Sequence, residues 1–332
     1  MSNASSNLLP KDSHGCPYLF LAPMEGVGDR PFRKALASIG GFDEAVTEFI
    51  SVPRNAHVES LAKVYQNKEL DPIPLAAQIM GADPLLMAAM AKELERKGAP
   101  RIDINCGCPS NTVTGRGAGS SLLKDPSYLY EVAKAVVNAI SIPVTIKMRS
   151  GYEDTSLFQE NVLAAQESGV SFITLHPRTK IDGYSPPARW DLIQTAKNLL
   201  RIPLVGNGDI VSVESAIALL TKTNCDALMI GRGAVMNPFI FHQIRSYFTK
   251  KIFTPTWPLL ERCLKIYLQE MPEHLSEKGR IGKLKQFMSF LFRSNPILLE
   301  KRQEMLKIDT KESTIFLENL LPILEYHYFS QF

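Results

Sequence analysis

The sequence alternates short apolar or β-branched runs with segments of helical periodicity, and this alternation limits the fold more than any other feature. The apolar runs recur at intervals of roughly 25–35 residues, each short enough for one buried strand. We therefore expect eight strands, at Tyr18–Met24, Ala45–Phe49, Leu75–Met80, Ile102–Asn105, Val144–Met148, Phe172–His176, Leu204–Asn207 and Ala227–Ile230.

Helical patterns fill most of the intervals between these runs. Three prolines stand at first-turn positions directly after a residue that can cap a helix, in the pairs Asp83-Pro84, Asp125-Pro126 and Asn237-Pro238. The expected helices are Arg30–Ser38, Pro84–Lys97, Pro126–Ala139, Leu157–Ser168, Trp190–Leu199 and Val213–Lys222, with a less regular one at Val58–Val64.

Eight strand–helix units in succession predict an α/β fold, specifically a (β/α)₈ TIM barrel. A doubly wound open sheet is the alternative, because alternation alone does not show that the first and last strands pair.

The pattern changes after Thr254–Pro258, where β-type runs stop and helical periodicity continues to the end of the chain. The expected helices there are Leu259–Met271, Arg280–Arg293, Ile297–Met305 and Ser313–Tyr326. We predict a disordered lead-in over residues 1–17, a catalytic barrel over 18–250 and a small all-helical domain over 251–332.

Composition bounds the class of protein. The 332 residues are 45% hydrophobic and 21% charged, without an apolar run long enough for a membrane span or a signal sequence. The five cysteines are scattered and form no CxxC pair, which favours reduced cytoplasmic thiols and argues against a zinc or iron–sulfur site. We expect a cytoplasmic, monomeric protein without a metal.

The net charge of +3 is too small to indicate a nucleic-acid partner, but its distribution is uneven. The segment 278–293 carries five basic residues and no acidic one, and Lys285 lies opposite its apolar stripe with Lys283 at the edge. Such a face is often only solvated. The functional alternative is contact with a phosphate backbone.

Polar residues stand at the predicted strand ends, where barrel enzymes gather their reactive groups. They are Glu25, Glu48, Gln78, Asn105, Lys147, Arg149, His176, Arg178, Asn207, Asp209 and Arg232. The glycine-rich ends of the last two strands, Gly206–Asp209 and Gly231–Gly233, predict a phosphate site built on backbone N–H groups, with Arg232 adding charge. Gln78 and Lys147 could then reach the ring system of that phosphorylated ligand, and a positive Lys147 would favour an anionic reduced flavin.

Two cysteines follow the fourth strand in the stretch Arg101–Lys124. Cys106 adjoins the strand and reads as a buried apolar residue, whereas Cys108 stands between Gly107 and Pro109 in a loop. Cys108 is therefore the candidate reactive residue.

These segments resemble the tRNA-dihydrouridine synthase family, most closely its bacterial C-type subgroup, which acts on uridine 16. The matching segments, in order, are LAPMEGVGD (21–29), VTEF (46–49), DINCGCPSNTVTGRGAGSSLLKDP (103–126), IKMRSG (146–151), LHPRTK with GY (175–184), GNGDI (206–210) and GRGAVMNP (231–238).

The resemblance implies reduction of a uridine in the tRNA D-loop to 5,6-dihydrouridine, with bound FMN and with NADPH as reductant. Cys108 would be the proton donor to C5, while hydride reaches C6. Asn105, Arg149 and Arg178 would face the tRNA, with Lys283 and Lys285 contacting phosphates. The implied FMN residues are Pro23, Met24, Gln78, Lys147, His176, Asn207, Gly208, Asp209, Gly231 and Arg232.

Two other functions remain open on the residues alone. One is a flavin barrel acting on a free small molecule, of the dihydroorotate or ene-reductase type. The other is an RNA-binding protein with an inactive barrel, which an intact Cys108, Lys147 and His176 argue against.

Overall fold

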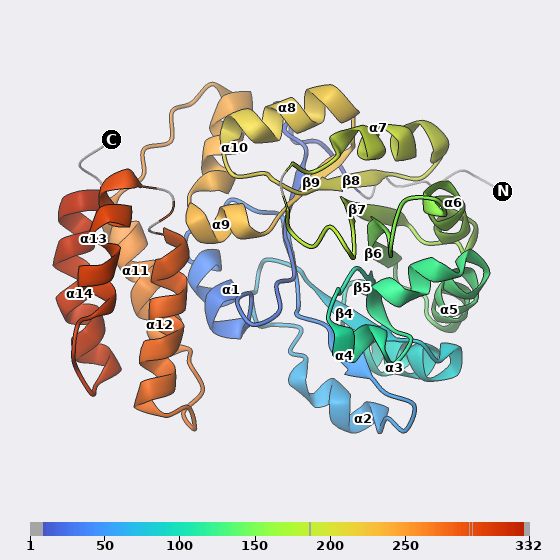
Figure 1. Cartoon of the computed structure of the whole chain (residues 1–332), viewed down its shortest axis with the longest axis horizontal. Helices are drawn as coiled ribbons and strands as arrows, with labels where there is room; N and C mark the ends of the chain where they lie inside the picture. Colours follow the sequence, from blue (N-terminus) through green and yellow to red (C-terminus); the bar gives the residue numbers. More distant parts are fainter. Residues whose placement is uncertain (1–8, 186, 292, 294, 329–332) are drawn as a thin grey trace.

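The computed structural model describes residues 9–328 except 186, 292 and 294, and its centre is a closed barrel of parallel strands (Figure 1). The barrel closes where β1 (Tyr18–Leu21) pairs with β9 (Ala227–Ile230), in the register Tyr18↔Ala227 to Leu21↔Ile230. The TIM barrel predicted from the alternation is confirmed, and the open sheet is excluded. The other strands are β2 (Glu44–Val46), β3 (Ile50–Val52), β4 (Leu75–Gly81), β5 (Ile102–Cys106), β6 (Val144–Gly151), β7 (Phe172–Thr179) and β8 (Leu204–Asn207).

Nine strands occupy eight barrel positions because β2 and β3 are two segments of one position. Both pair with β4, and the three residues between them, Thr47–Phe49, lie opposite only two residues of β4, so the ladder is interrupted there. The single strand predicted at Ala45–Phe49 is therefore wrong in its second half. β6 and β7 run three residues past their predicted ends, with a register irregularity between Arg149 and Gly151.

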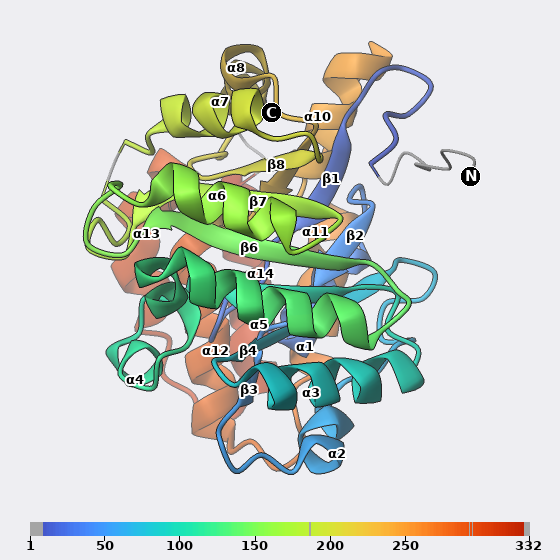
Figure 2. The same ribbon diagram turned by 90° about the vertical axis from the view of Figure 1, so that its right-hand side faces the viewer.

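Helices cover the outside of the barrel, as Figure 2 shows for α3, α5, α6 and α7. The caps predicted at Asp83 and Asp125 are present, since each carboxylate accepts two backbone N–H bonds of the helix that follows. The helices are α1 (Arg30–Ala37), α2 (Val58–Leu61) with the 3₁₀ turn η1 (Ala62–Val64), α3 (Pro84–Arg96), α4 (Asn111–Thr114), the 3₁₀ segment η2 (Gly119–Lys124), α5 (Pro126–Ala139), α6 (Phe158–Glu167), α7 (Trp190–Leu199), α8 (Val213–Thr223), α9 (Arg232–Met236) and α10 (Ile240–Thr249).

The start predicted at Pro238 is wrong. Asn237 Oδ1 accepts a bond from the Phe239 N–H, but α10 begins at Ile240. A short helix, α9, precedes this turn, so Asn237 and Pro238 lie in a connection between two helices.

Four further helices, α11 (Trp257–Gln269), α12 (Glu277–Leu291), α13 (Pro296–Leu306) and α14 (Ser313–Tyr328), group beside α1 and α9 (Figure 1). Aromatic contacts join them to the barrel: the Phe287 ring of α12 meets the Phe32 ring of α1 at 5.5 Å and the Tyr267 ring of α11 at 5.1 Å. Because Phe32 and Phe287 are both buried, the helices share one core with the barrel.

Residues 9–17 belong to the folded structure. Leu9 is 4% exposed and packs with Phe20, Phe172 and other side chains inside the barrel. Asp12 pairs with Arg245 of α10. The disordered lead-in predicted for residues 1–17 is therefore wrong for 9–17, because one apolar residue outside any periodic pattern anchors the segment. Residues 1–8 lie outside the described part.

A buried polar network crosses the barrel interior below its mouth. The Arg101 guanidinium bonds Glu44, Asp103 and Thr145, and it stacks over the rings of Phe20 and Phe172 at 5.5 and 4.9 Å. Each charge has a partner, which is the condition for keeping charges in such a place.

Within the described ranges, no helix has both the length and the apolar content needed to cross a membrane. The same residues contain no group of three His, Cys, Asp or Glu side chains that could hold a metal ion.

Candidate active site

A cavity of about 460 Å³ opens at the end of the barrel where the strands lead into their βα loops. This size lies within the range of small-molecule sites, and this face carries the reactive groups of barrel enzymes. The cavity brings together thirteen of the predicted site residues: Pro23, Met24, Gln78, Asn105, Cys108, Lys147, Arg149, His176, Asn207, Gly208, Asp209, Gly231 and Arg232.

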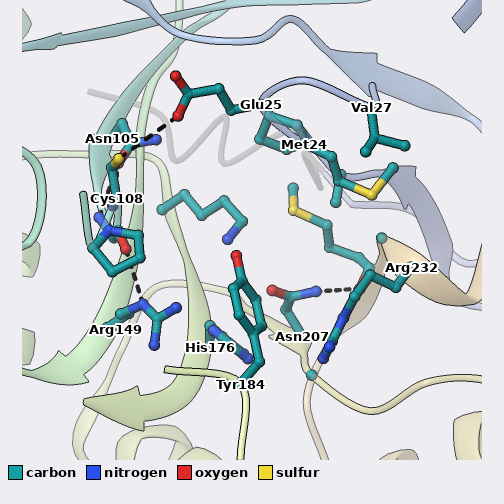
Figure 3. A pocket seen from close by; sticks show the side chains of 18 of the residues that line it. Met24, Glu25, Val27, Asn105, Cys108, Arg149, His176, Tyr184, Asn207 and Arg232 are labelled. Carbon is teal, nitrogen blue, oxygen red and sulfur yellow. Dashed lines mark hydrogen bonds between the residues drawn. The ribbon is translucent and has the colours of Figure 1, made fainter. Parts of the chain in front are cut away.

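Asn105, near the end of β5, holds the loop that carries Cys108. Its Oδ1 accepts the N–H of Gly107 at 3.0 Å and of Cys108 at 2.9 Å. The Cys108 carbonyl accepts the Ser120 hydroxyl at 2.9 Å. The Cys108 backbone is thus fixed from both sides, and its side chain lies at the cavity wall (Figure 3).

Arg149 of β6 also holds the loop after β5 that carries Cys108. Its Nε donates to the Gly107 carbonyl at 2.9 Å, and its Nη1 donates to the carbonyls of Thr179 and Gly183 at 2.7 and 2.8 Å. The guanidinium also lies 5.4 Å from the centre of the Tyr184 ring. Arg149 therefore ties the β5, β6 and β7 loops together and contributes a positive charge to the cavity.

Gln78 of β4 is oriented by its neighbours on β5. Its amide Nε2 donates to Asp103 at 2.7 Å, and its Oε1 accepts from the Asn105 amide at 2.8 Å. Asp103 in turn belongs to the Arg101 network. A chain of buried bonds thus runs from the barrel interior through Gln78 to Asn105 and the Cys108 loop.

Lys147 of β6 contributes an ammonium group that makes no hydrogen bond or ion pair to any residue the structure describes. Burial, and then the nearby Arg149, lower the pKa of Lys147 to about 8, while Asp103 opposes them. A cation that borders a cavity without a partner favours a ligand that presents an anionic group.

His176 of β7 lies between several cations. Burial and the charges of Lys147, Arg149, Arg178 and Arg232 hold its pKa well below the ordinary value of 6.5, so the ring is neutral at pH 7. A guanidinium only donates, so the Arg178 Nη1 at 3.1 Å requires His176 Nε2 to accept. The ring proton is therefore on Nδ1.

Arg178 is 1% exposed and bonds the Ser185 carbonyl, His176 and Asp209. This leaves it no free face for tRNA, and we assign it to holding His176 and Asp209 in place. Although burial acts against ionisation, the hydrogen bond from Arg178 and the charge of Arg232 leave the pKa of Asp209 lowered. Arg232 lies 3.6 Å from Asp209 and 4.6 Å from the centre of the Tyr184 ring.

The loops after β8 and β9 approach each other closely. A Cβ on Gly233 would stand 2.0 Å from the Ile210 carbonyl oxygen, and Gly208 has φ +115° with His176 3.0 Å from its hypothetical Cβ. Both positions therefore require glycine. The Asn207 amide donates to the Met229 carbonyl at 2.7 Å and joins the two strands.

The Cys108 thiol faces a carboxylate, because Glu25 Oε2 lies 4.0 Å from its Sγ (Figure 3). Burial and the charge of Glu25 raise the pKa of the thiol, while the Ser110 N–H and Arg149 act in the opposite direction. Cys108 is thus a protonated thiol at neutral pH. Cys106 is fully buried, as its position next to the strand predicted.

The cavity is also lined by Glu25 and Glu48, which the sequence placed at strand ends without assigning them a role, and by Tyr184 and Phe290, which the sequence did not single out. The two glutamates were expected at the barrel mouth because they follow strands, and the cavity lining confirms this position. Glu48 accepts the Gly26 N–H at 2.6 Å, and burial raises its pKa. Tyr184 lies in the loop after β7, in the segment 175–184 that carries the family resemblance, and Phe290 comes from α12, where the sequence pattern did not distinguish its ring from a core residue.

Lys283 and Lys285 of α12 lie outside the cavity. The Lys283 ammonium pairs with Asp29, the cap of α1, so it joins α12 to the barrel. The Lys285 ammonium lies 5.4 Å from the centre of the Phe316 ring. Their contact with phosphates stays a prediction.

The closed barrel and its mouth, with a thiol, a neutral imidazole and an unpartnered ammonium around one cavity, define a TIM-barrel enzyme. Residues 20–323 match the model of the family described as dihydrouridine synthase, and the chain belongs to this family.

Curated relatives cover most of the chain. It is 39% identical over 69% of its length, and 71% of the relative's, to a tRNA-dihydrouridine(16) synthase of Neisseria meningitidis serogroup B. It is 36% identical to the tRNA-dihydrouridine(16) synthase of Pseudomonas syringae, covering 83% of this chain and 90% of that one.

Among solved structures, a histamine dehydrogenase from Rhizobium matches with a TM-score of 0.53 and 12% identity, covering 86% of this chain and 51% of the other. At that identity the likeness concerns the fold alone.

Proposed function

We propose that this protein is an FMN- and NADPH-dependent tRNA-dihydrouridine synthase that reduces uridine 16 of the D-loop in the cytoplasm. The family membership supports the reaction class, and the names of the relatives support position 16. The observation that carries the proposal is the cavity itself, which sets a protonated thiol and an unpartnered ammonium around space for a planar ligand.

The residues present fit FMN. Lys147 would compensate negative charge on the reduced ring, and Gln78, whose orientation is fixed by Asp103 and Asn105, would contact the ring edge. The phosphate would lie against the loops after β8 and β9, where Gly233 permits close backbone approach and Arg232 supplies charge. His176 would offer its Nδ1 proton to the ligand.

When bound, the reduced flavin would supply hydride to C6 of the uracil. That carbon is electrophilic because the C5=C6 bond is conjugated with the C4 carbonyl, so hydride addition leaves negative charge on the C5–C4–O4 enolate. The Cys108 thiol would then protonate C5 as a general acid, and its thiolate would recover a proton from water. The loop bonds from Asn105 and Arg149 fix the sulfur for this transfer.

The target base must leave the folded tRNA to reach this cavity, which costs a few kcal/mol. Tyr184 and Phe290 offer aromatic faces at the cavity wall, and Arg149 offers a guanidinium. Phosphate contacts by the helical region, including Lys285, would offset the cost.

The test is mass-spectrometric mapping of dihydrouridine in tRNA from cells with and without the protein. We expect dihydrouridine at position 16 to disappear with the protein and return with the wild-type chain, but not with Cys108→Ala. The purified Cys108→Ala variant should still bind FMN and oxidise NADPH. Unchanged dihydrouridine at position 16, or full activity of that variant, would contradict the proposal. Turnover of a free pyrimidine with unmodified tRNA would favour a small-molecule reductase instead.

A further inference from the structure

The loop after β1 places a carboxylate directly against the thiol of Cys108. Glu25 Oε2 is 4.0 Å from Sγ, within reach of an S–H donor, although the two residues are 83 positions apart in the chain. Glu25 is exposed to solvent, and neither the family's proton donor nor the predicted cofactor residues include it. Among the residues that the structure describes, the Glu25 side chain makes no other hydrogen bond or ion pair, so no other polar contact explains its orientation toward Cys108.

A cysteine beside a bound uracil has two possible reactions. As a thiol it can give its proton to C5. As a thiolate it can attack C6, forming an S–C6 bond while the C5=C6 electron pair moves onto C5 and O4, which would block hydride addition at the same carbon. The ionisation state of the sulfur therefore decides between reduction and a covalent dead end.

We propose that the Glu25 carboxylate keeps Cys108 in its thiol form, so that this side chain acts on the bound pyrimidine as an acid and not as a nucleophile. The proposal rests on the proposed function for the identity of the pyrimidine. Its physical part, the control of one thiol by one carboxylate, does not depend on the substrate.

The charges around the sulfur come from several elements. Burial is the largest influence against thiolate formation and Glu25, on the β1 loop, adds to it, while the Ser110 N–H and then Arg149 of β6 favour the thiolate. Lys147, His176 and Glu48 also line the cavity but are not among the groups that shift the pKa of the thiol. Without Glu25, the influence of Arg149 would be left unopposed by any neighbouring carboxylate.

The experiment compares Glu25→Gln with wild type in the flavin-loaded protein, using iodoacetamide alkylation of the Cys108 peptide followed by mass spectrometry from pH 6 to 10. Cys108 borders the cavity, whereas Cys106, two residues away on the same proteolytic peptide, is fully buried, so assignment of the label by fragment ions reports the Cys108 thiol. Glu25 is exposed, so solvent screens its charge and the effect should be moderate. In Glu25→Gln we expect the midpoint of the alkylation rate against pH to fall by about one pH unit, and alkylation at pH 7 to become about tenfold faster. The alkylation midpoint of Glu25→Asp, which keeps the charge on a shorter side chain, should lie between those of wild type and Glu25→Gln.

Glu48→Gln is the matched control, since Glu48 is a second carboxylate at this cavity and is not among the charges that act on the Cys108 thiol. Its alkylation midpoint should equal the wild-type value. In tRNA reduction assays, the alkaline limb of the rate profile should move to lower pH in Glu25→Gln only. An unchanged or higher alkylation midpoint in Glu25→Gln, or an equal fall in Glu48→Gln, would overturn the proposal. Absence of dihydrouridine formation by wild type would contradict the proposed function while leaving the alkylation result valid.

Discussion

Lys147 illustrates a conflict between stability and ligand binding at a single residue. The folded protein lowers its pKa from 10.5 to about 8, chiefly by burial. At pH 7 the ammonium is charged in both the folded and unfolded states, so the folded state bears the whole cost of desolvating it. The cost fades as pH rises from about 8 and is gone above 10.5, where the lysine is neutral in both states.

We therefore expect Lys147→Met to stabilise the flavin-free protein at pH 7 by roughly 2 kcal/mol. This is less than the free energy that corresponds to the whole pKa shift of Lys147, because the ammonium borders the water of the cavity. The same substitution should weaken FMN binding at least tenfold. Thermal unfolding of the flavin-free protein and flavin titration check the two effects. A less stable Met variant at pH 7 would show that Lys147 has a stabilising partner in the folded state.

At the scale of elements, β4 and β5 act as a unit because their side chains are bonded across the ladder. Asp103 accepts from Gln78, Thr145 and Arg101, and Gln78 accepts from Asn105. The position of the Cys108 loop therefore depends on a carboxylate inside the barrel that never reaches the cavity.

Asp103→Asn should lower the free energy of unfolding by roughly 3 kcal/mol, because it leaves Arg101 with one carboxylate fewer in a buried site. Because Gln78 would lose its fixed orientation, FMN affinity should fall as well. Denaturant unfolding and flavin titration measure both quantities. The surface variant Asp191→Asn, on α7, is a suitable control and should change neither.

α12 contributes one side chain, Phe290, to the cavity wall. We expect Phe290→Ala to leave FMN binding within twofold of wild type, because the predicted flavin residues belong to the barrel. Its KM for tRNA should rise severalfold, because an aromatic face next to the flipped base is lost. Steady-state kinetics with tRNA transcripts provide the test. Equal KM values for tRNA in wild type and Phe290→Ala would show that Phe290 takes no part in substrate recognition.

The sequence predicted most elements because strand and helix periodicity is a local property. It placed β8, β9, α5 and α7 at their observed ends, and it identified the caps Asp83 and Asp125. Once the barrel is assumed, strand-end residues must meet at one face, which is why thirteen predicted residues line one cavity.

The errors have a common physical origin in contacts between distant parts of the chain. Leu9 is ordered by a core that it meets only after folding, and Arg178 is buried where it bonds Asp209 and His176. Phe290 and Tyr184 reach the cavity from a helix and a loop that no strand-end rule covers. Such partners cannot be read from periodicity or local composition.

At the scale of the whole molecule, the helical region and the barrel are joined by a core and by ion pairs. Lys283 pairs with Asp29, and Lys34 pairs with Glu270 at 2.8 Å. Removal of the chain beyond residue 252 would expose Phe32 and the rest of this interface, so a deletion cannot separate substrate binding from folding. Point variants are the better probe.

A double-mutant cycle with Asp29→Asn and Lys283→Met measures the link between the two regions. Asparagine keeps the capping oxygen that accepts the Phe32 N–H, so the cycle reports mainly the ion pair. We expect a coupling of about 1 kcal/mol in denaturant unfolding, because both side chains are mostly shielded. A coupling near zero would mean that apolar packing alone holds the helices to the barrel.

Leu9 and the Arg101 network fill the interior of the barrel away from its mouth, so within the described residues the cavity opens at the mouth. Under the proposed function, a dinucleotide reductant and a nucleic acid would both have to approach the flavin ring through this mouth, so they would bind in turn. Double-reciprocal plots of initial rate against one substrate, at several fixed concentrations of the other, should therefore give parallel lines. This is the pattern expected when the two substrates are never bound at the same time.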